Sequence, residues 1–212
     1  MTPIRCLVVD DHPIVRRGLR ELLTDEFPGV ELVECETGEA AVASVDHGNF
    51  DVALLDLSMP GRGGLDALKE IHARRPRLPV LVHTQHAEQQ YAIRALRAGA
   101  RGYVTKDTAP DELVRAVREV VAGRRYVTPA LAAELAAVVA ADPTRAPHDT
   151  LSDRELQVLQ MIGVGKTVSE IAAELGLSDK TISTYRSRVL EKLQLRTTAD
   201  LMRYALKSSL VD

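Results

Sequence analysis

Short apolar runs alternate with amphipathic stretches through roughly the first half of the chain. The runs have the length of strands buried on both faces, at residues 5–9, 30–35, 52–55, 79–83 and 102–104. Each is followed by apolar positions at helical spacing, from residue 13 onward and at 38–46, 64–74, 87–98 and 109–122. Residues 108–111 have the form of a capping box for the last helix. Five strand-helix repeats predict a parallel, doubly wound sheet.

The last third of the chain carries only helical patterns. Ser152 and Glu155 form a capping box, which predicts a helix up to about Gly163. Two apolar helical stripes follow, with Gly176 at the turn between them and Ser178 as the N-cap of the second. This is a helix-turn-helix pattern, and a final helix over about 198–208 completes an all-α unit of four helices.

The two patterned regions are separated by a different kind of sequence. Residues 130–141 are rich in alanine and predict a helix, and residues 142–150 are polar and punctuated by proline. We therefore expect a first domain at 1–123, a linker at 124–149 that contains a helix, and a second domain at 150–212. A chain of 212 residues with 45% hydrophobic residues is long enough for two modest cores.

Charge is distributed unevenly along the chain. The formal net charge is only −3, but residues 179–208 carry 7 Lys/Arg against 3 Asp/Glu. A local excess of positive charge is typical of a nucleic-acid surface, although a solvated helix face has a similar composition. By itself, charge does not decide between these interpretations.

The cysteines and the chain start favour an intracellular protein. Cys6 and Cys35 lie in apolar strand-like runs without metal-ligand spacing, so buried, reduced thiols are the simplest interpretation. The N-terminus lacks the pattern of a signal peptide, and no apolar run approaches the length of a membrane span. We therefore expect a cytoplasmic protein without a membrane partner.

Polar residues follow most of the predicted strands. In a parallel sheet the carboxyl ends of strands meet at one edge, where ligands bind. The residues placed there are Asp10, Asp11, Asp56, Thr84 and Lys106. Three carboxylates in one crevice repel each other unless a cation neutralises them, and Mg2+ prefers such oxygen ligands. Asp56 would then be able to attack phosphorus, with Lys106 pairing with the phosphoryl group and Thr84 donating a hydrogen bond.

Each of these residues also has a plainer explanation. The two acids after the first strand suit a helix N-cap, Thr84 suits a strand end, and Lys106 suits a surface charge. Their arrival at the same sheet edge favours a shared site. His12, His83 and His86 fall near it, but they show no metal-ligand pattern and are assigned no role.

The first region resembles the receiver domain of two-component signalling. The motifs that carry the resemblance are Val-Val-Asp-Asp-His-Pro at 8–13, Leu-Leu-Asp-Leu-Ser-Met-Pro-Gly at 54–61, Thr84, and Gly-Tyr-Val-Thr-Lys-Asp at 102–107. The resemblance implies a flavodoxin-like, five-stranded α/β sheet of order 2-1-3-4-5, the order known for receivers. It implies that Asp56 is the phosphoacceptor and that Mg2+ is held by Asp10, Asp11, Asp56 and the backbone carbonyl of Ser58. It further implies that Thr84 and Tyr103 form a switch pair.

The second helix of the helix-turn-helix offers small and cationic side chains on its polar face. Lys180, Thr181, Ser183, Thr184, Ser187 and Arg188 are candidates for major-groove contacts, and Arg186 and Lys192 for phosphate contacts. A solvated face of a plain helical bundle is the alternative. Residues 150–211 also resemble the DNA-binding domain of NarL/FixJ, or LuxR-type, regulators, through Leu-Ser-Asp-Arg-Glu, Glu-Ile-Ala and Ser-Asp-Lys-Thr-Ile-Ser-Thr-Tyr. The form Lys-Thr-Ile-Ser-Thr-Tyr-Arg is most similar to the BvgA/GacA-like branch.

Together, the two resemblances predict a response regulator. A sensor histidine kinase would phosphorylate Asp56, and this would promote a homodimer and its binding to double-stranded promoter DNA. The protein would not be an enzyme, beyond assisting its own phosphorylation and dephosphorylation. Two alternatives stay open: an aspartyl-phosphate enzyme acting on a separate substrate, and a helical output domain that binds a protein or RNA instead of duplex DNA.

Overall fold

The structure is a computed structural model that describes residues 3–59, 63–85, 89–133, 147–208 and 210–211. The chain divides into two compact units, which we call the N-terminal unit (1–141) and the C-terminal unit (142–212). The division lies within the predicted linker, whose limits at 124 and 149 stay a prediction. In the described part of the chain, no helix is both long and apolar enough to span a membrane.

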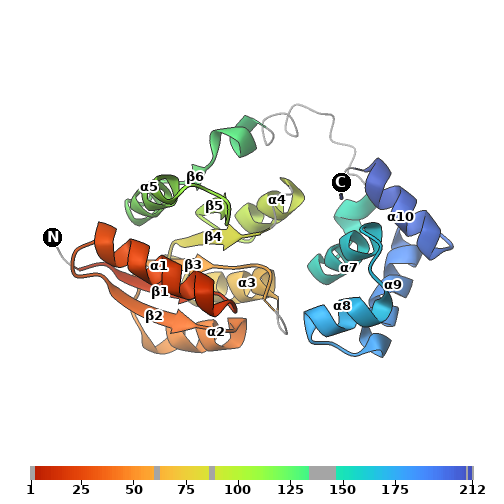
Figure 1. Ribbon diagram of the computed structural model, residues 1–212, viewed down its shortest axis with the longest axis horizontal. Helices are drawn as coiled ribbons and strands as arrows, with labels where there is room; N and C mark the ends of the chain where they lie inside the picture. The colour runs from red at the N-terminus through yellow and green to blue at the C-terminus, as the bar shows by residue number, and fades with distance from the viewer. Residues whose placement is uncertain (1–2, 60–62, 86–88, 134–146, 209, 212) are drawn as a thin grey trace. The chain divides into compact units, whose positions relative to one another are not determined.

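A parallel sheet forms the centre of the N-terminal unit (Figure 1). Its order is β2-β1-β3-β4-β5-β6, so the predicted order of five strands is confirmed and a sixth is added. The strands are β1 (Arg5–Val9), β2 (Glu31–Cys35), β3 (Val52–Leu55), β4 (Val80–Thr84), β5 (Gly102–Thr105) and β6 (Tyr126–Val127). The helices between them are α1 (Pro13–Glu26), α2 (Gly38–His47), α3 (Gly64–Arg74), α4 (Gln89–Arg97) and α5 (Pro110–Val121).

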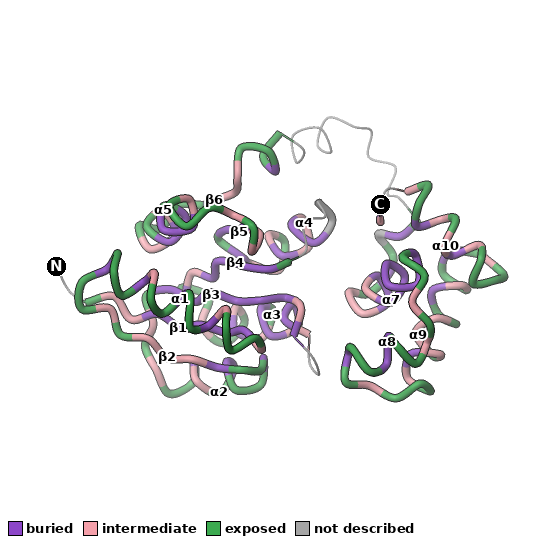
Figure 2. The backbone as a smooth tube through the Cα atoms, in the orientation of Figure 1, coloured by how far each residue is buried: buried purple, intermediate pink, exposed green. Residues whose placement is uncertain are grey.

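Helices cover both faces of this sheet, and the strand sequences show why. In β1, Leu7 and Val9 pack with α2, α3 and α4, whereas Cys6 and Val8 pack with α1 and α5. All four residues of β3 are buried (Figure 2). A strand with an apolar layer on each side has no polar face, which explains the unbroken apolar runs in the sequence.

The sixth strand lies where the sequence predicted linker. After α5, Gly123 adopts a positive φ of 81°, and the chain returns to the sheet edge. Tyr126 pairs with Gly102 of β5, and its hydroxyl donates a hydrogen bond to Glu112 of α5 at 2.8 Å. Residues 129–133 are helical, but the rest of the helix predicted at 130–141 falls outside the described residues.

The C-terminal unit contains the four predicted helices, preceded by a single 3-10 turn, η1 (Pro147–Thr150). The helices are α7 (Asp153–Gly163), α8 (Val168–Leu175), α9 (Asp179–Lys192) and α10 (Thr198–Lys207). The capping box of Ser152 and Glu155 is present at the start of α7, as predicted. Leu156, Ile171 and Ile182 meet in a common core that also receives α10.

The turn between α8 and α9 has the predicted chemistry. Gly176 ends α8 in the left-handed region with φ 64°, where a side chain would be strained. Ser178 begins α9, and its hydroxyl accepts a hydrogen bond from the N–H of Thr181 at 3.2 Å. These two residues set the angle at which α9 leaves α8.

Candidate functional site

The carboxyl ends of β1, β3, β4 and β5 bring four of the predicted residues together. The amino group of Lys106 lies 2.7 Å from Oδ2 of Asp10 and 2.7 Å from Oδ2 of Asp56. Asp10 and Asp56 are each 1% exposed, and Thr84 is fully buried. Lys106 is anchored by its own N–H, which donates to the carbonyl of Thr84 at 2.8 Å. The cluster is a buried acid pair bridged by one cation.

Backbone hydrogen bonds fix the two acids at the sheet edge. The N–H of Asp10 donates to the carbonyl of Cys35, and that of Asp56 donates to the carbonyl of Val9. These bonds extend the ladders of β1 with β2 and β3 by one residue. Oδ1 of Asp56 also accepts a hydrogen bond from the N–H of Ser58 at 2.9 Å. Because the backbones of both acids are fixed at the ends of their strands, their carboxylates point to the same edge of the sheet.

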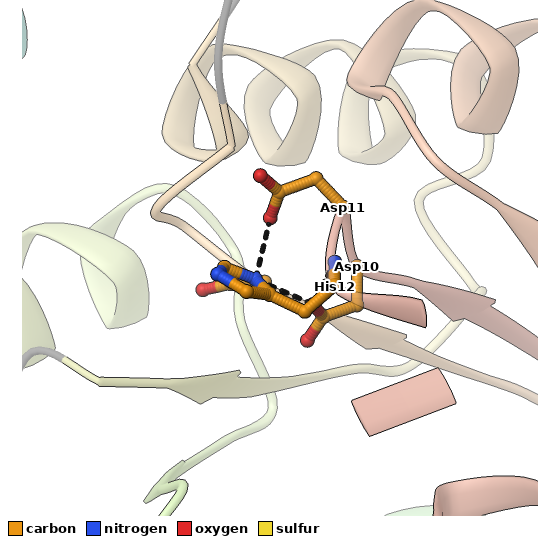
Figure 3. A group of neighbouring side chains, drawn as sticks. Asp10, Asp11 and His12 are labelled. Atoms are coloured by element: carbon orange, nitrogen blue, oxygen red, sulfur yellow. Dashed lines mark hydrogen bonds and ion pairs between the residues drawn. The ribbon is translucent and has the colours of Figure 1, made fainter. Parts of the chain in front are cut away.

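Asp11 and His12 complete the acidic side of the site. Figure 3 shows the imidazole of His12 reaching both neighbouring acids. Its Nδ1 lies 2.9 Å from Oδ1 of Asp11 and 3.2 Å from Oδ1 of Asp10. Asp11 is partly exposed, with 26% of its side chain accessible. The sequence assigned His12 no role, yet its ring connects two of the predicted metal ligands.

The charges at this site stabilise one another. Burial alone would raise the pKa of Asp56, but hydrogen bonds from Lys106 and from the N–H of Ser58 outweigh it, and the pKa falls below its usual value. Burial would lower the pKa of Lys106, but its bonds to Asp10 and Asp56 raise it instead. At neutral pH, Asp56 is therefore an ionised carboxylate beside an ionised ammonium group.

The donor atoms suit a hard divalent cation. Asp10, Asp11, His12 and Asp56 each offer one ligand atom, and all four atoms lie within 4.8 Å of one another. Mg2+ binds oxygen at about 2.0–2.1 Å, so opposite ligands lie about 4 Å apart, and only a small closure of this cluster is needed. Three of the four donors are carboxylate oxygens, which fits the predicted ion. The contribution of the Ser58 carbonyl stays a prediction.

The predicted switch residues are both buried. The hydroxyl of Thr84 lies 3.2 Å from the hydroxyl of Ser58, so the two share a hydrogen bond. Tyr103 lies on β5 and is 1% exposed, in the core that α2, α3 and α4 cover. Thr84 lies on β4 and Tyr103 lies on β5. These two strands are neighbours in the sheet and pair from Leu81 and Gly102 onward. A switching role for them remains a prediction.

Three residues that shape the site were given no role from the sequence. A Cβ on Gly64 would lie 2.1 Å from the carbonyl oxygen of Asp56, so α3 packs directly on the backbone of Asp56. Arg16 is buried and donates to the carbonyl oxygen of Asp10 at 2.7 Å. His83 is 6% exposed, and its Nδ1 has no hydrogen-bond partner among the described residues. Burial and the Lys106 charge lower the pKa of His83 to about 4.

The sequence gives only a weak indication that His83 and Arg16 are buried. His83 stands in an apolar run that predicted a buried strand, and burial on both faces of such a strand is the signal that could have identified it. Arg16 lies three residues before Leu19 and seven before Leu23, so helical spacing places it, and not Arg17, beside the apolar face of the helix. His86 falls outside the described residues.

The second candidate surface is the polar side of α9. Ile182 and Val189 are buried against the other helices, so the opposite side of α9 faces outward. The predicted contact residues follow this division: Lys180, Thr184, Ser187, Arg188 and Lys192 are exposed, and Thr181, Ser183 and Arg186 are partly exposed. The surface therefore presents cationic and small hydroxyl side chains.

Several of these side chains already have partners within the C-terminal unit. The hydroxyl of Thr184 donates to the carbonyl of Lys180, and that of Ser187 donates to the carbonyl of Ser183, both at 2.9 Å. The amino group of Lys192 lies 2.6 Å from the carboxylate of Glu155. That carboxylate is nearly buried; burial would raise its pKa, but Lys192 lowers it. Lys192 thus links the end of α9 to the start of α7.

Comparisons with known proteins cover both units. Residues 6–118 match the response regulator receiver domain, and residues 149–205 match the bacterial regulatory proteins of the luxR family. The chain is 38% identical to the response regulator UvrY of Escherichia coli K12 over 209 residues, covering 98% of this chain and 95% of UvrY. It is 38% identical to the response regulator GacA of Pseudomonas aeruginosa over 212 residues, covering 99% of this chain and 98% of GacA.

Solved structures of one regulator are similar over nearly the whole chain. RcsB from Salmonella enterica serovar Typhimurium, bound to promoter P1flhDC with the phosphomimetic BeF3−, is 29% identical, with a TM-score of 0.61 and coverage of 96% and 98% of the two chains. A second RcsB structure contains two dimers on two parallel DNAs, with 28% identity, a TM-score of 0.61 and the same coverage. The chain therefore belongs to the response regulators of the NarL/FixJ type, which join a receiver domain to a luxR-family DNA-binding domain, in the branch of GacA and UvrY.

Proposed function

We propose that a sensor histidine kinase phosphorylates Asp56, and that this modification promotes a homodimer that binds promoter DNA through α9. The observation that carries the proposal is the buried Asp56 carboxylate, paired with Lys106 beside two further acids. A transcriptional regulator of this family needs such an acceptor in one unit and a DNA-binding surface in the other. The receiver would assist only its own phosphorylation and dephosphorylation.

The chemistry follows from the charges at the site. A carboxylate oxygen of Asp56 attacks phosphorus, an O–P bond forms, and the P–N bond to the histidine of the kinase breaks as the imidazole regains a proton. Mg2+, held by Asp10, Asp11, Asp56 and the carbonyl of Ser58, would offset the negative charge that repels the incoming phosphoryl group. The low pKa of Asp56 keeps it ionised and nucleophilic at neutral pH.

Phosphorylation would exchange hydrogen bonds around the site. The ion pair between Lys106 and the Asp56 carboxylate would be replaced by one between Lys106 and a phosphoryl oxygen. The phosphoryl group carries more negative charge than the carboxylate, so this ion pair would be stronger. The hydroxyl of Thr84 now faces that of Ser58 at 3.2 Å, and it would turn to donate to the phosphoryl group. Space vacated by Thr84 would let the Tyr103 ring shift on the adjacent strand. This rearrangement would favour a second conformation of the receiver surface.

The output surface rests on α9 and on the RcsB complexes. One of those complexes contains promoter DNA, and the other contains RcsB dimers bound to DNA. In a homodimer, two copies of α9 would enter major grooves about one helical turn apart, which predicts a site with two related halves. The exposed cations Lys180 and Arg188 would contribute contacts to phosphates or base edges.

A binding selection on short DNA duplexes tests the proposal. It would use the full chain, Asp56→Ala, and Asp25→Ala as a matched control that removes an exposed acid of α1. Each protein would be selected with and without Mg2+ and a small phosphodonor. We expect one two-halved site to be enriched, and the donor to strengthen binding for the wild type and Asp25→Ala but not for Asp56→Ala.

The other outcomes separate the parts of the proposal. Site-specific binding that ignores the donor and Asp56 would keep the DNA-binding function and overturn the phosphorylation switch. A phosphorylated protein that selects no duplex would overturn DNA binding and favour a protein or RNA partner. Turnover of an added phosphorylated substrate, with release of inorganic phosphate, would favour the aspartyl-phosphate enzyme.

A further inference from the structure

Arg16 is a buried cation on a helix face that is otherwise apolar. It shares this face of α1 with Leu19 and Leu23, and only 9% of its side chain is exposed. A guanidinium group removed from water is costly unless its donors are hydrogen-bonded and its charge is paired. The contacts of Arg16 therefore show what its burial accomplishes.

Those contacts join α1 to two strand ends. Nη1 donates to the main-chain oxygen of Asp10 at 2.7 Å, and Nη2 donates to the carboxylate of Glu36 at 2.5 Å. Nε lies 3.6 Å from the carboxylate of Glu34, at the carboxyl end of β2. One side chain thus connects the residue that follows β1 with the end of β2.

Both main-chain groups of Asp10 are hydrogen-bonded, the N–H to a strand and the carbonyl to Arg16. Its N–H donates to Cys35 of β2, and its carbonyl accepts from Arg16. That carbonyl lies where β1 leaves the sheet, one residue beyond the last ladder pair of Val9 with Cys35. Both anchors lead back to β2. The carboxylate of Asp10 can therefore serve Lys106 and an ion, because the backbone is fixed independently of them.

We infer that Arg16 is a positioning residue for the cation site, holding the main chain of Asp10 so that Asp10 and Asp11 face the same ion as Asp56. The inference rests on the proposed Mg2+ site. Arg16 contacts the main chain of a ligand residue and no ligand atom, and it acts through the turn that carries both acids. Its contacts with the partly buried Glu34 and the exposed Glu36 join the other side of the guanidinium to the end of β2.

Electrostatics alone makes the opposite prediction. Arg16 carries a positive charge near a cation site, so its removal should tighten cation binding if charge were its only influence. A positioning role predicts weaker binding, because the acids lose their common orientation. The sign of the change in affinity therefore distinguishes the two roles.

The test measures Mn2+ binding to the full chain by electron paramagnetic resonance, with Mg2+ as competitor. Arg16→Gln removes the charge and the bond to Asp10, and we expect the Mn2+ dissociation constant to rise about tenfold. Arg16→Lys keeps the charge and one donor, and we expect a rise of about threefold. Arg20→Gln is the matched control, because Arg20 pairs with Glu34 from the same helix at 61% exposure without contacting Asp10; we expect less than a twofold change.

Thermal unfolding of each variant without metal separates positioning from folding. If Arg16→Gln does not fold, Arg16→Lys carries the test, with Glu36→Gln as a variant that loosens the anchor but keeps the bond to Asp10. Unchanged or tighter Mn2+ binding in a folded Arg16 variant would overturn the positioning role and leave the metal site standing. Failure of the wild type to bind Mn2+ or Mg2+ would overturn the proposed metal site and, with it, the role of Arg16.

Discussion

The receiver site and the polar face of α9 use polar residues in contrasting ways. At the receiver site, the buried carboxylates of Asp10 and Asp56 both pair with Lys106, whose side chain is 10% exposed, and the three residues follow three different strands. On α9, Thr184 and Ser187 are exposed and bond to the carbonyls of their own helix. A buried charge must be partnered, so its position is determined by the fold; an exposed hydroxyl has water as an alternative, so its position reveals little about its function.

This difference predicts where a substitution will be felt. Changes at the receiver site should alter the stability of the N-terminal unit as well as its chemistry, because each group holds another in place. Changes of exposed α9 side chains that have no partner outside their own helix should leave folding nearly intact and act on DNA binding. We therefore expect the largest losses of stability at the receiver site and the smallest effects among the exposed hydroxyls of α9.

Removing the cation that bridges two buried acids should have the largest effect on stability. Lys106→Met leaves Asp10 and Asp56 facing each other without a charge partner, and we expect a loss of about 4 kcal/mol in unfolding free energy without divalent metal. Mg2+ should restore part of it. Urea unfolding at pH 7.5 measures both, and Lys69→Met, an exposed lysine of α3, is the control. A loss below about 1 kcal/mol would show that these acids are not held by Lys106.

A methyl group added against the backbone of Asp56 should cost nearly as much stability. Gly64→Ala would place Cβ 2.1 Å from the Asp56 carbonyl, and we expect α3 to move, with a loss of about 3 kcal/mol and slower phosphorylation. Gly18→Ala is matched, because nothing lies within 4 Å of its Cβ; helix propensity predicts a gain of about 0.5–1 kcal/mol there. Equal effects in urea unfolding would contradict the close packing of α3 on β3.

His83 should make the N-terminal unit sensitive to acid. Its pKa is about 4 in the folded protein against about 6.5 when unfolded, so the unfolded state binds more protons between these values. The stability present above pH 6.5 is therefore lost as the pH falls toward 4, by about 2 kcal/mol at pH 5. Comparing unfolding free energies of the wild type and His83→Leu at pH 7.5 and pH 5 isolates this contribution. Parallel pH profiles would show that His83 is not buried as a neutral ring.

The same contrast explains how far the sequence could predict the structure. Strands β1 and β3 were predictable because burial on both faces makes their sequences continuously apolar, and their ends then placed Asp10 and Asp56. Lys106 could be placed at the same edge for the same reason. The site followed from the topology, because parallel strands must end together.

Features that depend on a single tertiary contact were not predictable. Strand β6 has only two residues, and its pairing depends on the exposed edge of β5. The capping box predicted at Thr108 is wrong: α5 begins after Ala109 without a side-chain cap, and the hydroxyl of Thr108 lies 3.3 Å from that of Thr105. Side chains near a turn have several partners of similar energy, and the fold selects among them.

On α9, an exposed cation should affect binding but not folding. Arg188→Gln removes one positive charge from the outward face, and we expect about tenfold weaker binding to the selected duplex and a salt-dependence slope reduced by about 1. The unfolding midpoint should stay unchanged. Arg203→Gln, a largely exposed arginine on α10, is the control. An unaltered affinity and slope would show that Arg188 contacts neither the phosphates nor the base edges.

The smallest effect is expected at Ser187, although the sequence placed it among the DNA contacts. Its hydroxyl donates its only proton to the carbonyl of Ser183, so it has no proton left for an acceptor on a base edge or for a phosphate oxygen. Replacing it with alanine removes no donor from the surface, and we expect Ser187→Ala to change DNA affinity by less than about twofold, or about 0.4 kcal/mol. Fluorescence anisotropy with the selected duplex measures this change. A loss of tenfold or more would mean that the Ser187 hydroxyl leaves the carbonyl of Ser183 and donates to DNA in the complex. The bound DNA, and not the fold, would then determine the hydrogen-bond partners of the exposed hydroxyls on α9.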